Sequence, residues 1–428
     1  MSGSPGPGVP KHLNRLSDVS NAGYCIGCGA CAYADPASVE LVNIENLGIR
    51  PRFTGSGPEA GGGGGDLTYC PGAHLDGELV SKRPPATHAE HEFGVALEIW
   101  EGHATDPEIR WNASSGGLLT ALSLHCLEAE GMGGVLHTGA DKSHPWRNRT
   151  VMSHTREELL SRTGSRYAPS SPCEGLGQVE TSETPCVFVG KPCDTAATMA
   201  LRQTRPELDR KLGLVLTFFC AGTPSNRGTL DLMSNMGFAS SEATSVRYRG
   251  QGWPGLFTVQ APGKEPGTMT YDQSWGRLTG YRPLRCNLCP DGVGRLADIA
   301  CGDAWNRFDK TKDDPGQSLV LVRTERGRQI LRRAIERGVV QLRRVDEQAM
   351  FDAQPNLLQR RRDIQGRLLA LRAVGLPVPK FDGFSLQYSW RQAGFKNKAK
   401  TVIGTMRRAI QRDWWRRPEA TRRGTAAS

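Results

Sequence analysis

The 428-residue sequence contains no hydrophobic run as long as the about 18–20 residues that a membrane-spanning helix needs. Its first ten residues are rich in glycine, proline and serine, and they lack the apolar segment of a secretory signal. Hydrophobic residues make up only 38% of the chain, which suits a soluble protein. We therefore predict a cytoplasmic protein without a spanning segment, beginning with a disordered lead-in over 1–20.

Acidic residues are also fewer than basic ones. The chain has 44 Asp and Glu against 54 Lys and Arg, a formal net charge of +10 at pH 7. This charge favours acidic partners, and an acidic electron carrier, a phosphorylated cofactor, anionic lipid and nucleic acid all qualify. The length allows two domains or one large α/β body with appendages, because a single core stops growing near about 250–300 residues.

Twelve cysteines in a reducing compartment are better explained by metal ligation or redox chemistry than by disulfides. Cys25, Cys28 and Cys31 form a C-x2-C-x2-C run, a spacing characteristic of [4Fe-4S] ligation. Where the bacterial ferredoxin pattern continues with Cys-Pro, this chain has Asp35 before a proline. We predict Cys70 as the fourth ligand because thiolate is the softer iron donor, with Asp35 as the alternative. A zinc knuckle also remains open.

A second group of cysteines is spread along the chain. Cys193 and Cys220 each follow a predicted strand, and Cys286 and Cys289 form a C-x2-C pair in a later loop. Parallel strands place their C-terminal ends along one edge of a sheet, so the four could converge on one metal cluster. The alternatives are a redox disulfide within the pair and simple buried thiols elsewhere. We interpret the remaining cysteines as structural: Cys126, Cys173, Cys186 and Cys301.

Apolar runs alternate with helical patterns through the middle of the chain, which is typical of β-α units. We predict strands, each leading into a helix, over 186–189, 212–219 and 319–322. The predicted fold class is α/β: a mixed-sheet flavin-binding body, an N-terminal ferredoxin-like iron–sulfur segment and a basic helical appendage. These parts span 93–353, 21–92 (with the glycine run 61–65) and 354–428, respectively.

Two motifs are candidates for nucleotide binding. A predicted helix start offers hydroxyls, little steric bulk and unpaired backbone N–H groups, the components of a phosphate cradle, at Ser114, Ser115, Gly116 and Gly117. A plain N-cap explains these residues equally well. A second motif adds a cation and an aromatic ring suited to a dinucleotide, at Ser165, Arg166 and Tyr167. Asp298 and Asp303 could orient ligand groups, or simply cap turns.

Together these segments resemble the coenzyme F420 hydrogenase/dehydrogenase beta-subunit family. The matching pieces run in order from about Tyr24 to Trp305: CIGCGAC, CPG, SSGGLLTAL, GSRYAPS, FVGKPCD, FFCAGTPSNRGT, VRYRGQGW and RCNLCPDGVGRLADIACGDAW. The resemblance implies FAD, at least one [4Fe-4S] cluster and electron transfer through the flavin. It also favours a cluster at the second cysteine group. The basic region after about Gln354 matches no motif of the family.

A flavin accepts single electrons from a cluster and delivers a hydride to an organic acceptor. The predicted function is therefore electron transfer between clusters, FAD and coenzyme F420 or another organic substrate, with a partner redox subunit and no nucleic acid. Lys191, beside Cys193, is predicted to stabilise reduced flavin or bind an anionic substrate; its alternative is an ordinary solvated lysine. The alternatives in function are a ferredoxin-dependent reductase of a non-deazaflavin substrate and a zinc-stabilised binding module.

The C-terminal stretch surrounds apolar residues with lysines and arginines. The apolar positions follow helical spacing: Val402, Ile403, Met406, Ile410 and Trp414. Such a helix could lie on an anionic membrane surface, which would place the protein peripherally at the inner membrane face. It could instead pack on the main body with its charges solvated, and we favour this second interpretation.

Overall fold

The structure, a computed structural model, describes residues 8–54, 66–309 and 314–418. Part of the predicted lead-in, residues 1–7, and the glycine run 61–65 lie outside the described residues. The prediction of disorder up to residue 20 is wrong for its last residues. These last residues include the start of a short helix, α1 (Leu16–Asn21), whose Leu16 and Val19 side chains are buried in the protein.

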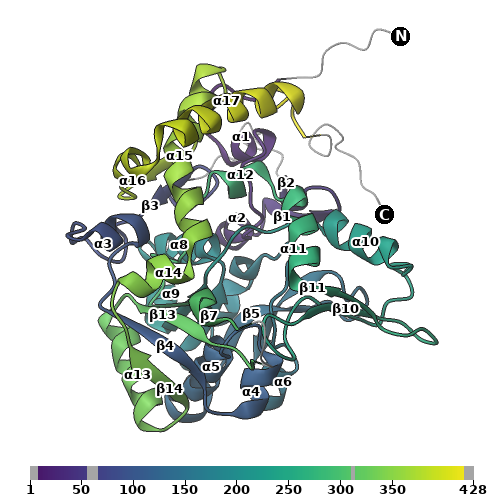
Figure 1. Cartoon of the computed structure of the whole chain (residues 1–428), viewed down its shortest axis with the longest axis vertical. Helices are drawn as coiled ribbons and strands as arrows, with labels where there is room; N and C mark the ends of the chain where they lie inside the picture. Colours follow the sequence, from purple (N-terminus) through teal and green to yellow (C-terminus); the bar gives the residue numbers. More distant parts are fainter. Residues whose placement is uncertain (1–7, 55–65, 310–313, 419–428) are drawn as a thin grey trace.

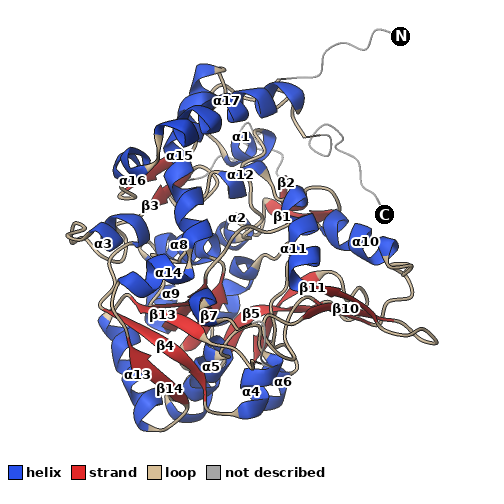
Figure 2. Cartoon of the chain, in the orientation of Figure 1, coloured by secondary structure: helices blue, strands red, loops and turns tan. Residues whose placement is uncertain are grey.

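An eight-stranded mixed sheet forms the centre of the protein, as the sequence predicted (Figure 2). Its order is β14 (Val340–Arg344), β4 (Glu98–Ala104), β13 (Ser318–Val322), β12 (Ile299–Asp303), β8 (Leu212–Phe218), β7 (Cys186–Gly190), β5 (Val135–Ala140) and β6 (Asn148–Ser153). The four strands β12, β8, β7 and β5 are parallel, and every other neighbouring pair is antiparallel. The parallel strands therefore share one carboxyl edge.

Helices cover both faces of this sheet because alternate strand residues point to opposite sides. In β7, Val187 faces one core and Phe188 the other. The first face is covered by α4 (Pro107–Asn112), α5 (Leu118–Ala129), α6 (Arg156–Leu160) and α13 (Glu325–Glu336). The second face is covered by α2 (Ala30–Ala34), α3 (His88–Phe93), η1 (Pro172–Gly175), α7 (Leu176–Glu180), α8 (Pro192–Arg202), α9 (Pro206–Lys211) and α14 (Gln348–Ala353).

A smaller unit extends from one side of the body in Figure 1 and has a core of its own. It contains β9 (Ser245–Arg247), β10 (Leu256–Gln260), β11 (Gly267–Thr270), α10 (Asn226–Asn235), α11 (Tyr271–Leu278) and η2 (Thr279–Tyr281). A second short 3-10 helix, η3 (Trp305–Arg307), follows the end of β12. This unit and η3 contribute aromatic residues to the cavity described below.

The two ends of the chain pack together. The N-terminal segment adds α1, the hairpin of β1 (Val39–Ile44) and β2 (Gly48–Phe53), and β3 (His74–Asp76), which pairs in parallel with β15 (Lys380–Asp382). Around them lie α12 (Leu284–Asn287), α15 (Pro355–Ala373), α16 (Leu386–Gln392) and α17 (Phe395–Gln411). Tyr24 and Ala73 share a core with Leu368 and Leu371. The basic appendage is thus integrated with the cysteine-rich segment.

No helix among the described residues is long and apolar enough to cross a bilayer.

Candidate functional site

The N-terminal cysteines line a small cavity of about 30 Å³, which they share with Tyr69 and Pro71. Its thiols belong to Cys25, Cys28, Cys31 and Cys70. Burial raises the pKa of Cys70 to about 12 and also raises that of Cys31 and Cys25. The negative charges of the Cys28, Cys25 and Cys70 thiolates add to the rise in the pKa of Cys31. A cluster would supply the positive charge that stabilises these thiolates.

Two glycines allow the cysteine loop to turn this tightly. Gly27 and Gly29 have φ of 70° and 89°. A Cβ atom on Gly27 would lie 2.6 Å from the carbonyl oxygen of Ile49, and one on Gly29 would lie 2.7 Å from the backbone nitrogen of Glu174. The loop is therefore held close to β2 and η1. A side chain at either glycine would push it away.

Asp35, the alternative fourth ligand, lies elsewhere. It is exposed at the end of α2, and its Oδ1 accepts a hydrogen bond from the backbone N–H of Ser38 at 3.2 Å. It does not line the cysteine cavity. The structure brings Cys70, and not Asp35, to the other three cysteines.

The second cysteine group lines another small cavity, at the carboxyl ends of β7 and β8. Its members are Cys193, Cys220, Cys286 and Cys289. Burial is the main reason that the pKa of Cys220 rises to about 12, with Cys286 adding to the effect. Cationic side chains line the same cavity: Arg50, Lys191, Arg285 and Arg360. These cations would offset the negative charge of a thiolate-bound cluster.

Each donor set consists of four thiols, the ligand type of a [4Fe-4S] cluster. All twelve cysteines are free thiols. Over the described residues, no three His, Cys, Asp or Glu side chains converge closely enough to hold one metal ion. Zinc requires sulfur atoms about 2.3 Å from a single centre. The four thiols of each group line one small cavity.

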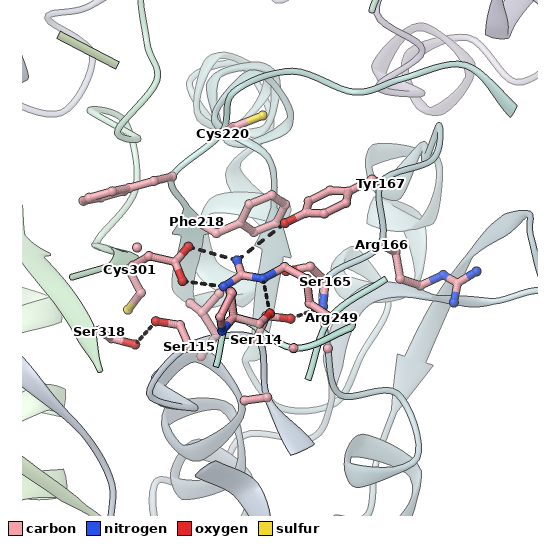
Figure 3. A pocket seen from close by; sticks show the side chains of 18 of the residues that line it. Ser114, Ser115, Ser165, Arg166, Tyr167, Phe218, Cys220, Arg249, Cys301 and Ser318 are labelled. Atoms are coloured by element: carbon pink, nitrogen blue, oxygen red, sulfur yellow. Dashed lines mark hydrogen bonds and ion pairs between the residues drawn. The ribbon is translucent and has the colours of Figure 1, made fainter. Parts of the chain in front are cut away.

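A large cavity of about 1210 Å³ opens at the carboxyl edge of the parallel strands. This exceeds the roughly 300–1,000 Å³ of common ligand pockets, so a dinucleotide and a second planar molecule have room. Six of the predicted nucleotide-binding residues line it: Ser114, Ser115, Gly117, Ser165, Arg166 and Tyr167. Figure 3 shows most of these residues around the cavity, with Phe218 and Cys220.

The two nucleotide motifs meet at this cavity. Gly117, with φ of 79°, precedes α5, whose first-turn N–H groups have no acceptor within the helix. The backbone N–H of Ser165 donates to Ser114 Oγ at 2.6 Å, which joins the motifs. Gly116 does not line the cavity, because its N–H donates to Ser318 Oγ at 2.9 Å and holds the loop against β13. The Ser115 hydroxyl is also engaged, since it donates to the carbonyl oxygen of Gln317 at 2.7 Å. The available anion-binding groups are therefore the start of α5 and the hydroxyl of Ser114.

Arg166 does not offer a free guanidinium to a ligand. Its nitrogens donate to Asn148 Oδ1 and to the carbonyl oxygens of Pro145, Arg147 and Val246. Figure 3 shows the group pointing away from Ser114 and Arg249. Arg166 therefore fixes the loop that carries its two neighbours.

Lys191 is likewise fully engaged. Its Nζ donates to Asp194 Oδ2 at 2.7 Å, to Ser170 Oγ at 2.8 Å and to the Ser170 carbonyl at 3.1 Å. Burial alone would lower the pKa of Lys191, but the charges of Asp194 and Cys193 and the hydrogen bond to Asp194 together raise it. The ammonium has three N–H donors and all three are used. The geometry gives Lys191 a positioning role between the cavities.

An ion pair that the sequence did not reveal forms part of the cavity wall. Arg249 donates to both carboxylate oxygens of Asp303, at 2.7 and 3.0 Å, and Trp253 Nε1 donates to the same carboxylate at 2.8 Å. The guanidinium lies over the rings of Tyr271 and Trp305, at 4.8 and 5.4 Å from their centroids. Arg249 and Trp253 stand in the segment VRYRGQGW, which is the signal that could have identified them.

The three cavities adjoin one another in series. Ile26 lines both cysteine cavities. Four residues line both the second cysteine cavity and the large cavity: Lys191, Cys220, Gly222 and Thr223. The second cysteine group therefore lies between the N-terminal group and the large cavity.

Comparison with known proteins gives consistent matches. Two family models match, described as coenzyme F420 hydrogenase/dehydrogenase beta subunit, N-terminal part over residues 99–176 and C-terminal part over residues 184–348. The chain is 25% identical over 303 residues to coenzyme F420 hydrogenase subunit beta of Methanococcus voltae, covering 67% of this chain and 99% of that protein.

Two further matches are more distant or shorter. The chain is 25% identical over 250 residues to F420-dependent formate dehydrogenase 1 subunit beta of Methanococcus maripaludis, covering 58% of this chain and 61% of that one. Among solved structures, a chain of the xenon-derivatised F420-reducing [NiFe] hydrogenase complex from Methanosarcina barkeri matches with a TM-score of 0.49 and 19% identity, covering 75% of this chain and 94% of that chain.

Proposed function

The chain belongs to the coenzyme F420 hydrogenase/dehydrogenase beta-subunit family of oxidoreductases, and we propose that it transfers electrons between two [4Fe-4S] clusters, FAD and an organic carrier of the coenzyme F420 class. The relatives are named as subunits of a hydrogenase and a formate dehydrogenase. We therefore expect a partner redox subunit to supply or remove the electrons.

The observation that carries this proposal is the serial arrangement of the three cavities. Ile26 borders both cysteine groups, and Cys220 borders both the second group and the large cavity. Electrons that enter at the N-terminal group would thus meet the second group before the large cavity. The cysteines of the two groups would hold the clusters through their thiolates.

The large cavity suits FAD. The start of α5 and the Ser114 hydroxyl would bind its phosphates, while Ser115 holds the loop through Gln317. Ser165 and Tyr167 would contact the rest of the dinucleotide. Phe218 is 36% exposed at the end of a central strand and offers an apolar surface to a planar ring. When bound, a flavin would exchange single electrons with a cluster and a hydride with an organic carrier.

The protein's own part in this chemistry is to shape and shield the cavity. The Arg249–Asp303 pair, buried beside Trp253 and Trp305, fixes one wall in a single geometry. The Lys191–Asp194 pair does the same at the passage to the second cysteine group. Both pairs are internally neutralised, so they orient the wall without presenting an unpaired charge to the ligand.

The second candidate function is a ferredoxin-dependent reductase of a different organic substrate. A cluster of arginines near the second cysteine group favours it: Arg282, Arg360 and Arg367. The pKa of Arg282 falls to about 10, first because of burial and then because of the charges of Arg360 and Arg367. Such concentrated positive charge would receive an acidic one-electron carrier. The sequence-derived zinc module is the least supported alternative.

The test is an anaerobic absorption spectrum of the purified protein with metal, sulfide and flavin analysis. We expect a brown protein with non-covalent FAD and roughly eight irons, four for each cysteine group. Zinc in place of iron would refute the redox proposal, and about four irons would remove one cluster from it. Oxidation of reduced coenzyme F420, measured beside oxidation of reduced ferredoxin, then separates the two candidate functions.

A further inference from the structure

The helix α17 packs on the protein through its small side chains. Its buried positions are Thr401, Thr405 and Ala409. Thr401 Oγ1 donates to Asp363 on α15 at 3.2 Å, and Ala409 lies in the core beside Ile364 and Leu368 of the same helix. The packed side of α17 is therefore defined by α15, and it contains none of the large apolar residues of α17.

Three large apolar residues of α17 point outward instead, while Val402 and Met406 are half-buried. Phe395, Ile403 and Ile410 are 85, 65 and 66% exposed. They are the three most exposed large apolar side chains among the described residues, and the next, Leu256, is 46% exposed. A helix that only had to pack on its own protein would place such residues inward. Their clustering on one helix indicates a surface that binds a partner beyond the part of the chain that the structure describes.

The charges around these residues have one sign. The helix has no acidic residue, and its cations are Lys396, Lys398, Lys400, Arg407 and Arg408. At about 100° per residue, Phe395, Ile403 and Ile410 fall within about an 80° arc. Three exposed cations occupy the adjoining arc of about 40°: Lys396, Lys400 and Arg407. We call these six residues the outer face of α17.

We propose that the outer face of α17 binds the surface of an anionic lipid bilayer. Its phenylalanine and isoleucines would enter the boundary between headgroups and acyl chains, while the lysines and arginine contact lipid phosphates and carboxylates. The methylene stems of lysine and arginine can lie along the apolar surface and still keep the charge in water.

The composition of this face favours lipid over protein. Cores of protein–protein interfaces are depleted in lysine, whereas membrane-surface helices combine large apolar residues with lysine and arginine. A second copy of the chain would bring two cationic faces together, and like charges oppose that contact. Figure 1 shows α17 at the end of the molecule opposite α13 and β14. No residue of α17 lines the large cavity, so lipid binding leaves that cavity open to its ligands.

Vesicle cosedimentation of the full-length protein tests the proposal, with vesicles of phosphatidylcholine alone and of phosphatidylcholine with phosphatidylserine. We expect binding to the phosphatidylserine vesicles only, weakened by salt. Lys396→Gln with Lys400→Gln should lower the partition coefficient about 30-fold, since each nearby cation contributes about a factor of five. The matched control, Lys82→Gln with Lys142→Gln, removes two exposed lysines elsewhere and should bind as the parent does.

The apolar part of the outer face is tested by Phe395→Ser with Ile403→Ser and Ile410→Ser. Because these side chains are exposed, this variant should fold normally, as circular dichroism would verify, and should lose vesicle binding. Leu97→Ser, at a residue 37% exposed beside β4, is the control that should keep binding. The proposal is overturned if the parent ignores phosphatidylserine vesicles or if the triple variant binds like the parent. It is also overturned if the triple variant loses only a self-association, seen by sedimentation velocity.

Discussion

The buried pair of Lys191 and Asp194 gives the sharpest test of what this lysine does. Lys191→Met removes the only ammonium near Asp194, whose side chain is fully buried. Asp194 Oδ1 has no hydrogen-bond partner even in the parent, and Oδ2 would keep only the backbone N–H of residue 191 at 2.9 Å. Leaving a buried carboxylate unpaired costs about 3–5 kcal/mol of unfolding free energy.

The loss of unfolding free energy in Lys191→Met should depend on pH in a defined direction. Burial raises the folded pKa of Asp194, and Lys191 opposes that rise. Without the lysine, the folded pKa rises further above the unfolded value of about 3.9. A raised folded pKa gives stability that is present below the unfolded pKa and is lost as pH increases through the folded pKa. The deficit of Lys191→Met should therefore be smallest near pH 4 and grow as the pH is raised, as pulse proteolysis in urea would measure.

The double variant separates a positioning role from a chemical one. Lys191→Met with Asp194→Leu removes both charges, so we expect most of the stability to return, short of about 1 kcal/mol for the lost backbone cap. The double variant should also hold as much FAD and iron as the parent. If the double variant is stable and fully loaded but the flavin is no longer reduced, the lysine acts in the chemistry and our reasoning is wrong. A single variant as stable as the parent would refute the structural role as well.

Three further outcomes test the cofactor sites. Cys70→Ser should lower iron from roughly eight toward about four per chain, while Asp35→Ala should keep it; the reverse ranking would make Asp35 the ligand. Cys289→Ser should lose a similar share of iron and should also stop reduction of the flavin by a one-electron donor. Unchanged flavin reduction would contradict electron transfer through the second cysteine group. Gly29→Ala should release iron because its Cβ would lie 2.7 Å from the backbone of a neighbouring helix, whereas Cys126→Ser should leave iron content unchanged.

The sequence predicted those parts of the fold that depend on local patterns. The apolar run at 212–219 becomes β8, and 319–322 lies within β13, because strands covered on both faces need continuous apolar residues. The convergence of Cys193 with Cys220 followed from one topological rule, since β7 and β8 are parallel neighbours. Spacing and strand order sufficed for these predictions.

The same reasoning could not predict contacts between segments that are far apart in the sequence. Arg249 and Asp303 are 54 positions apart, and no local sequence pattern around either residue predicts their contact. The sequence places Asp194 three residues after Lys191, so their ion pair could have been predicted. The contacts of Lys191 with Ser170, which complete its hydrogen bonding, could not. The periodicity at the C-terminus correctly predicted a helix, yet it could not tell that small residues would face the protein and Ile403 would face outward.

The order of the three cavities follows from how the chain is connected. Lys191 follows β7 directly and Cys220 lies two residues after the end of the neighbouring strand β8. The sheet therefore fixes the passage between the second cysteine group and the large cavity. The N-terminal group reaches this region through Ile26 and the hairpin strand β2, outside the sheet. A carrier of single electrons is thus expected at the cysteine side. A hydride carrier is expected at the large cavity, because its size and its aromatic lining residues, among them Phe218 and Trp305, suit a planar molecule.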